Sequence, residues 1–206
     1  MDVLKGSTAR AHATTEEIPF NAGILDKSLP RDRFAAQVRD WGGLHAAIES
    51  AIEQQDQEDI ARVWALTGPR AGLLRNDLTH LGDCYECSDA DVVVQEFTHW
   101  VNGLADTDPI ALLGVLYVFE GSQLGGMILK TPLSEMYDLD SEHGLSYYSV
   151  HGSGIRKHWM AFREGMNASV VTEAQQASVI DAANRTFEFV GRLLECLSRD
   201  LSTSAA

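Results

Sequence analysis

The chain has 206 residues, which suits a single domain large enough to bury a full core without disulfides. Its 45% hydrophobic and 22% charged residues are typical of a soluble globular protein and exclude a disordered or collagen-like chain. Its formal net charge of −14 excludes nucleic-acid binding through bulk charge, so an anionic ligand has to be held by a few local cations.

The N-terminal segment, residues 4 to 16, places Lys5, His12 and Glu16 at helical spacing. In a helix, Lys5 and His12 would share a face, and Glu16 would follow His12 at the i+4 position. A carboxylate there can accept the second ring N–H of a histidine and orient a metal-ligating imidazole. His12 is therefore a candidate ligand, although a lone histidine near an N-terminus is more often an ordinary surface residue.

Ser28 and Pro30 indicate the start of a long helix, with Ser28 as its cap and Pro30 in its first turn. Apolar side chains then recur every three or four positions, which predicts an amphipathic helix. This stripe consists of Phe34, Val38, Trp41, Leu44, His45, Ile48 and Ile52.

A further helix is expected from Asp89 to Leu104, where apolar residues again fall on one face. Cys84 and Cys87 precede it with C-x-x-C spacing. No second cysteine pair accompanies them and no strand precedes them, so we interpret the pair as a loop feature rather than a zinc or redox site.

Pro109 opens another helix, whose apolar run over residues 110 to 133 is interrupted by glycines. A glycine in a helix interior costs about 0.8 to 1 kcal/mol relative to alanine, so several in one segment need a reason. Gly114, Gly121 and Gly125 fall on one helical face, and Gly125 with Gly126 could kink the helix. A face without side chains allows close approach, either by a flat ligand or by the backbone of another helix.

The C-terminal part begins with the best strand candidate, Tyr147 to Val150, and ends with a helix that Thr172 and Glu173 open. The inner face of this last helix consists of Val179, Ala183, Thr186, Phe187, Val190, Leu193, Leu194 and Leu197. We predict one all-α domain over residues 1–201, with about seven to nine helices, and a short flexible tail at residues 202–206.

Three features concern the compartment. No apolar run reaches the roughly 18 to 20 residues that cross a bilayer, and the N-terminus lacks a hydrophobic signal region. An odd number of cysteines, three, does not make a disulfide framework. We predict a cytoplasmic protein without a membrane or nucleic-acid partner.

Several segments together resemble the heme oxygenases that produce biliverdin, in the form found in bacteria. The similarity runs in the same order from about residue 4 to residue 197. It is carried by Lys5, Thr8, His12, Glu16 and Phe20, by the stretch from Tyr117 to Gly126, by Phe162 to Asn167 and by Ala183 to Phe187.

The resemblance implies a heme between two helices, with heme as both the substrate and the oxygen-activating cofactor. His12 would be the iron ligand, and Gly121, Ser122 and Gly125 would face the bound oxygen. Mammalian-type members have an aspartate where this chain, like bacterial members, has Ser122. The implied heme-binding residues are Lys5, Glu16, Tyr117, Gly126, Arg163 and Phe187.

The function implied by the resemblance is oxidative cleavage of heme to biliverdin, carbon monoxide and ferrous iron. Dioxygen would be the oxidant, and electrons would come from a ferredoxin, flavodoxin or reductase type of donor. Two alternatives stay open. A heme-binding carrier or sensor on the same fold would need the same His12 and glycine face. A non-heme di-iron oxygenase would need Glu96 and His99, an E-x-x-H motif, with Asp77 and His80 as its partner.

Overall fold

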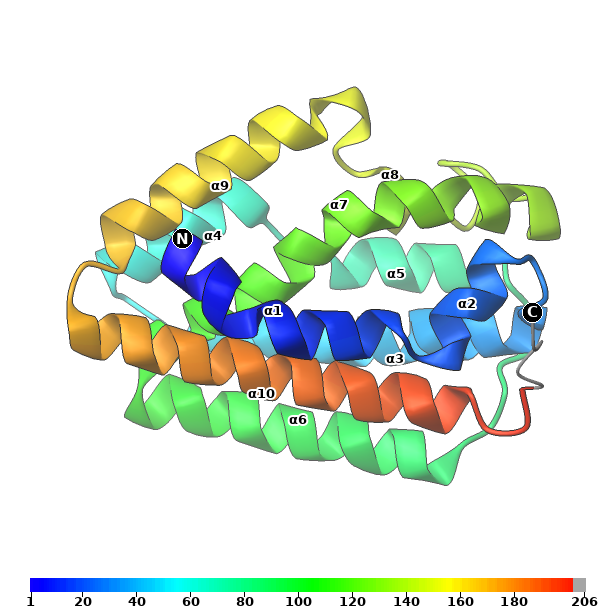
Figure 1. The fold of residues 1–206 in the computed structure, drawn as a ribbon, viewed down its shortest axis with the longest axis horizontal. Helices are drawn as coiled ribbons and strands as arrows, with labels where there is room; N and C mark the ends of the chain where they lie inside the picture. Colours follow the sequence, from blue (N-terminus) through cyan, green and yellow to red (C-terminus); the bar gives the residue numbers. More distant parts are fainter. Residues whose placement is uncertain (202–206) are drawn as a thin grey trace.

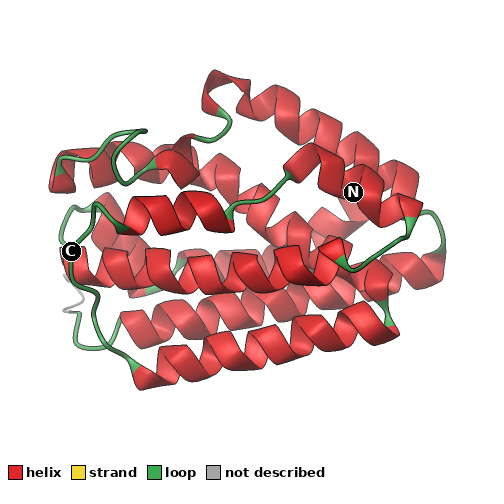
Figure 2. Cartoon of the chain, turned by 180° about the vertical axis from the view of Figure 1, so that it is seen from behind, coloured by secondary structure: helices red, strands yellow, loops and turns green. Residues whose placement is uncertain are grey.

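The fold consists of helices, as predicted. The computed structural model describes residues 1–201, which form ten α-helices and two short 3-10 helices (Figure 1). Within these residues no strand is present, and the only β-type pairing is an isolated bridge between Asp140 and Gly144 (Figure 2). The predicted tail at residues 202–206 lies outside the described residues. The elements are α1 (Asp2–Glu16), α2 (Pro19–Leu25), α3 (Arg31–Glu53), α4 (Glu58–Thr67), α5 (Ala71–Leu78), α6 (Ser88–Thr107), η1 (Pro109–Ala111), α7 (Leu112–Tyr137), α8 (Ser146–Ser149), η2 (Gly152–Gly154), α9 (Ile155–Ser169) and α10 (Glu173–Leu197).

The ends of the long helices follow local chemistry. At the start of α10, the Thr172 hydroxyl accepts the N–H of Gln175, and the Gln175 side chain accepts the Thr172 N–H, which completes a capping box. α3 begins directly after Pro30. Proline lacks a backbone N–H, but an N–H at this position would have no partner within the helix, so its absence costs nothing. Ser28 is not its cap, because the Ser28 hydroxyl bonds Asp26 instead.

The core lies between the apolar faces of the long helices. α10 packs against α1, α6 and α7, and α3 packs against α5 and α6, while α4 packs against α9 (Figure 1). The stripes predicted for α3 and α10 are both buried, as expected for helices at the centre of the domain. Buried hydrophobic side chains from Leu4 to Leu197 form one continuous cluster.

The strand expected at Tyr147 is wrong, because residues 146 to 149 form the short helix α8. The carboxylate of Asp77, at the end of α5, accepts the backbone N–H groups of Ser146 at 2.8 Å and Tyr147 at 2.9 Å. These are the N–H groups that a helix start leaves unpaired. A buried carboxylate from a distant segment therefore stabilises a turn that the aromatic side chains disfavour.

α7 runs as one continuous helix through Gly121, Gly125 and Gly126, so a kink at these glycines stays a prediction. Gly114 has a clear packing role. A Cβ at Gly114 would lie 2.2 Å from the carbonyl oxygen of Val179 and 3.0 Å from the Ala183 nitrogen, both backbone atoms of α10. The missing side chain thus lets two helix backbones touch.

The segment from Pro109 to Tyr137 is long and apolar enough to cross a membrane by length and composition alone. The expectation that no apolar segment reaches this length is therefore wrong for this helix. Its most apolar window is 61% buried inside the domain, which is typical of the core helix of a soluble protein.

We expect Gly114→Ala to destabilise the fold by about 1 to 3 kcal/mol, because α7 and α10 must separate to admit the methyl group. Gly103→Ala is the matched control. Gly103 also lies inside a helix, but no described atom would come within 4 Å of its Cβ, so we expect a gain of about 0.5 to 1 kcal/mol. Urea unfolding measures both, and equal effects would contradict a role for Gly114 in packing.

Candidate functional site

His12 lies on α1 with its side chain 54% exposed. Its Nδ1 is 3.2 Å from Oε2 of Glu16, one helical turn later, as the spacing predicted. A neutral His12 with its ring proton on Nδ1, facing Glu16, would leave the Nε2 lone pair free to bind a metal. Phe187 of α10 meets the His12 ring edge-on, with 5.7 Å between ring centroids. The structure therefore brings His12, Glu16 and Phe187 together, with Nε2 available as a ligand.

The two predicted cations lie towards the beginning of α1. Lys5 is exposed on α1, one turn after Asp2. Arg163 of α9 donates to Oδ1 of Asp2 at 2.6 Å, and the Met1 ammonium donates to Asn167 at 2.8 Å. These contacts join the N-terminal end of α1 to α9. Arg163 and the Met1 ammonium therefore lie at this end of α1, on an otherwise acidic protein, while the role of Lys5 stays a prediction.

Three residues of α7 form an open face. Gly121 and Gly125 are one turn apart, and Ser122 between them is exposed, with its hydroxyl donating to the Phe119 carbonyl at 2.7 Å. Among the described residues, no heavy atom lies within 4 Å of the place where a Cβ of Gly125 would stand. At Gly121 the nearest atom is in the Trp159 ring, at 3.7 Å. This face leaves room for a flat ligand.

The other two predicted residues of α7 point elsewhere. Gly126 is buried, and a Cβ there would lie 3.3 Å from Tyr148, so its small size serves the packing of α7 against α8. Tyr117 is 8% exposed, and its ring lies 6.1 Å from that of Trp159, which stacks on Phe162. The heme contacts implied for Gly126 and Tyr117 stay predictions.

A buried polar pair lies beneath the open face. Nε2 of His45 is 3.0 Å from the Tyr147 hydroxyl, and the His45 ring packs on Phe119. Burial, together with repulsion from Arg70, lowers the pKa of His45 to about 3, so the imidazole is neutral. Burial also raises the pKa of Tyr147 far above its usual value, although a hydrogen bond with Ser122 opposes this. Polar groups therefore continue from Ser122 into the interior.

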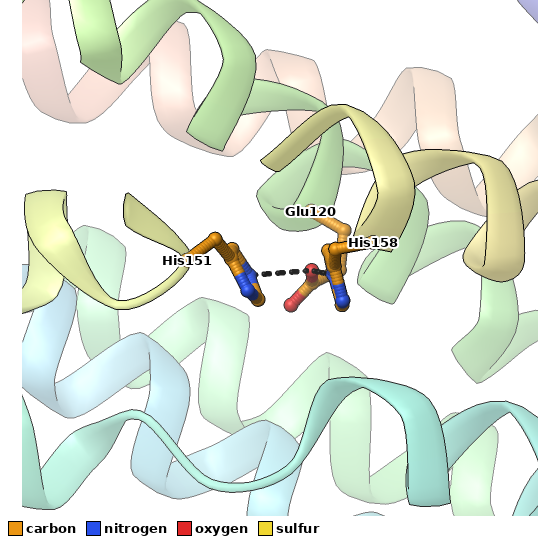
Figure 3. A group of neighbouring side chains, drawn as sticks. All are labelled: Glu120, His151 and His158. Atoms are coloured by element: carbon orange, nitrogen blue, oxygen red, sulfur yellow. Dashed lines mark hydrogen bonds and ion pairs between the residues drawn. The ribbon is translucent and has the colours of Figure 1, made fainter. Parts of the chain in front are cut away.

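Sequence reasoning missed a cluster around Glu120, the residue before Gly121. The Glu120 carboxylate is 4% exposed and lies 2.6 Å from Nε2 of His158 and 3.6 Å from Nε2 of His151 (Figure 3). On its other oxygen, Arg70 approaches to 3.4 Å. Burial opposes ionisation, but the contacts with both histidines and the charge of Arg70 outweigh it and lower the pKa of Glu120 to about 2.

Two signals in the sequence pointed to this cluster. Glu120 is the single charged residue between Ile110 and Leu129, and a charge in a buried helix has to be paired. His151 and His158 are seven residues apart, but His151 precedes α9, so the spacing alone did not place them together. Their rings stack with 3.6 Å between centroids.

The structure does not assemble the di-iron alternative. Glu96 forms an exposed ion pair with Arg192, and Asp77 binds the start of α8. In the described part of the chain, the only group of three or more candidate metal ligands is Glu120, His151 and His158. Cys84 and Cys87 are free thiols in the loop before α6, as their interpretation as a loop feature requires.

Comparison with known proteins gives a consistent picture. Residues 1–196 match the family model described as heme oxygenase. Among curated proteins, none matches the chain.

Solved structures share the fold at low sequence identity. Heme oxygenase from Leptospira interrogans is 18% identical, with a TM-score of 0.82 over 94% of this chain and 97% of that one. Heme oxygenase-2 from Synechocystis sp. PCC 6803, in complex with heme and NO, is 20% identical, with a TM-score of 0.85 over 95% and 83%. Heme oxygenase 2 from Chlamydomonas reinhardtii, without heme, is 16% identical, with a TM-score of 0.81 over 94% and 95%.

In mild acid, His45 stays neutral in the folded chain but takes up a proton in the unfolded chain. Protonation of this residue should therefore favour unfolding as the pH falls. The unfolded chain binds the extra proton below pH about 6.5, whereas the folded chain binds it only near pH 3. His45→Gln keeps a polar partner for Tyr147 but removes this proton-binding group. Between pH 7 and pH 5, we expect the free energy of unfolding of the unchanged protein to fall by about 2 kcal/mol more than that of His45→Gln. Urea unfolding at both pH values measures this difference. Parallel losses would mean that His45 is protonated in the folded protein.

Proposed function

This chain belongs to the heme oxygenase family, and on that premise we propose that it cleaves heme oxidatively to biliverdin, carbon monoxide and ferrous iron. Dioxygen is the oxidant, and electrons come from an external donor of ferredoxin, flavodoxin or reductase type. One observation carries the proposal. His12 is 54% exposed, and its Nδ1 lies 3.2 Å from Oε2 of Glu16, which supports Nε2 as the atom that would bind the iron.

The residues present fit a heme between α1 and α7. Heme, when bound, supplies both the ring that is cleaved and the iron that activates dioxygen. His12 orients it by binding the iron, and Glu16 fixes the tautomer of His12. Phe187 packs against the His12 ring and limits its rotation.

The open face of α7 limits the space on the side of heme opposite His12. Gly121 and Gly125 carry no side chain, so the helix backbone itself lies against the macrocycle. Ser122 supplies the exposed hydroxyl on this face and is the residue we assign to ordering water there. Gly126 lets α7 lie close to Tyr148, and its contact with heme stays part of the proposal.

The two heme carboxylates need cations on a chain with a net charge of −14. Lys5 and Arg163 supply them, with Tyr117 as a candidate hydroxyl donor. Arg163 already binds a carboxylate, that of Asp2, so heme binding exchanges one carboxylate partner for another. Since Asp2 is highly exposed, the pair that is given up contributes little.

The cellular setting we propose is the cytoplasm, without a membrane partner. The apolar segment from Pro109 to Tyr137 supports this, because its most apolar part is used inside the domain. Electron transfer then takes place between two soluble proteins.

We expect His12→Ala to remove the histidine-bound ferric heme signal while the fold is kept, because the side chain is half exposed and lies outside the core. Hemin titration followed by electron paramagnetic resonance measures the ligand, and added imidazole should restore the signal. His143→Ala, an exposed histidine paired with Asp140, is the control. An unchanged spectrum in His12→Ala would show that another residue binds the iron.

A second prediction concerns the open face. Gly125→Leu should slow bilin formation by at least about tenfold, equivalent to about 1.4 kcal/mol of barrier, because the side chain fills the oxygen side of heme. Its melting temperature should stay close to that of Gly103→Leu, a glycine with equally open surroundings. Absorption spectra after hemin and reductant are added measure turnover. If the unchanged protein binds heme but forms no bilin, it is a carrier or sensor rather than an enzyme.

A further inference from the structure

We propose that Glu120, His151 and His158 form a binding site for a divalent transition-metal ion, in addition to the heme iron assigned to His12. One ligand atom from each residue lies within 4.8 Å of the other two (Figure 3). Two imidazole nitrogens and one carboxylate oxygen suit Zn²⁺, Fe²⁺ or Co²⁺, and such three-ligand sites leave further positions open for water or a small ligand.

The two oxygens of Glu120 have different neighbours. Oε2 lies 2.6 Å from Nε2 of His158 and 3.6 Å from Nε2 of His151, so it is the oxygen shared by both imidazoles. Oε1 faces Arg70 at 3.4 Å. A metal ion on Oε2 would therefore leave Oε1 paired with Arg70.

Nε2 of His151 faces both other charged groups of the cluster, 3.2 Å from Nη2 of Arg70 and 3.6 Å from Oε2 of Glu120. A metal ion would bind Nε2 in the tautomer that carries the ring proton on Nδ1. The ion would then take the place of the Arg70 N–H at that nitrogen. At His158, a metal ion would replace the proton now shared with Glu120.

The site is held in place before any ion binds. The side chains of Glu120, His151 and His158 are only 4%, 13% and 14% exposed. Glu120 comes from α7 and His158 from α9, while His151 immediately precedes η2. The two imidazoles stack within 18° of parallel, so one ring has to turn before both Nε2 lone pairs can face the same ion. The three side chains are nevertheless close together before any ion binds.

Arg70 sets the charge of the site. It balances Glu120 in the absence of an ion, and its buried Nε has no hydrogen-bond partner among the described residues. A dication bound to Oε2 would be repelled by the guanidinium, so Arg70 lowers the affinity for the ion. Removing that charge should therefore raise the affinity for the metal ion. If Glu120, His151 and His158 form only a hydrogen-bonded cluster, the same change should only weaken that cluster.

The test uses the full chain without added heme, with Co²⁺ alone as the probe. Isothermal titration gives the stoichiometry, and visible absorption of bound Co²⁺ reports nitrogen coordination. We expect one equivalent at the site. Glu120→Gln and His151→Ala should weaken binding by at least about tenfold, since even outer-shell partners of a metal are worth that much. Arg70→Gln should strengthen binding.

Two features make the result decisive. His143→Ala removes an exposed histidine elsewhere and should leave the Co²⁺ isotherm unchanged. His151→Ala changes a residue outside the α-helices, and thermal melts verify that this variant is folded. If no saturable Co²⁺ binding occurs, or if Glu120→Gln, His151→Ala and Arg70→Gln all bind as the unchanged protein does, the metal site does not exist. Heme binding, read separately from the Soret band, is not affected by either outcome.

Discussion

The buried carboxylate of Glu120 constrains this structure more than any other single group. An unpaired charge at 4% exposure would cost several kcal/mol, so its partners have to converge on it. They come from three segments: Arg70 from the link before α5, His151 from the segment after α8, and His158 from α9. This convergence fixes α9 beside α7. It also places Trp159, the residue after His158, against Gly121.

The helices could be predicted from the sequence because the signals for them are local. Apolar spacing located α3, α6 and α10, and Thr172 with Glu173 located the start of α10. The error at Tyr147 has a non-local cause. Asp77, seventy residues earlier in the chain, pairs with the N–H groups that make a helix there possible, and no local pattern contains that contact.

In the candidate site, too, contacts within one helix could be predicted from the sequence, whereas contacts between distant segments could not. His12 and Glu16 are one turn apart, so their contact followed from the helix itself. Phe187 was assigned to the heme pocket only through the family resemblance, and its contact with His12, 175 positions earlier in the chain, was not predicted. Gly114 was predicted to share a helix face with Gly121 and Gly125. Its role differs from theirs, because α10 packs against α7 at Gly114, whereas no other element among the described residues covers Gly125. The spacing of residues in the sequence shows which side of the helix they lie on, but not which other element packs against that side.

The burial pattern along α7 has a mechanical consequence. Every residue from Leu112 to Glu120 is buried, and Gly114 brings this half into backbone contact with α10. After Glu120 the helix is only partly covered, and Gly125 has open space beside it. α7 is held again at its far end, where Leu133 is buried and the Tyr137 hydroxyl donates to the Leu29 carbonyl at 2.6 Å. The uncovered stretch around Gly125 is therefore a span supported on both sides. A substitution at Gly125 would change the space over that span, while the contacts at Gly114 and Tyr137 keep both ends of the helix in place.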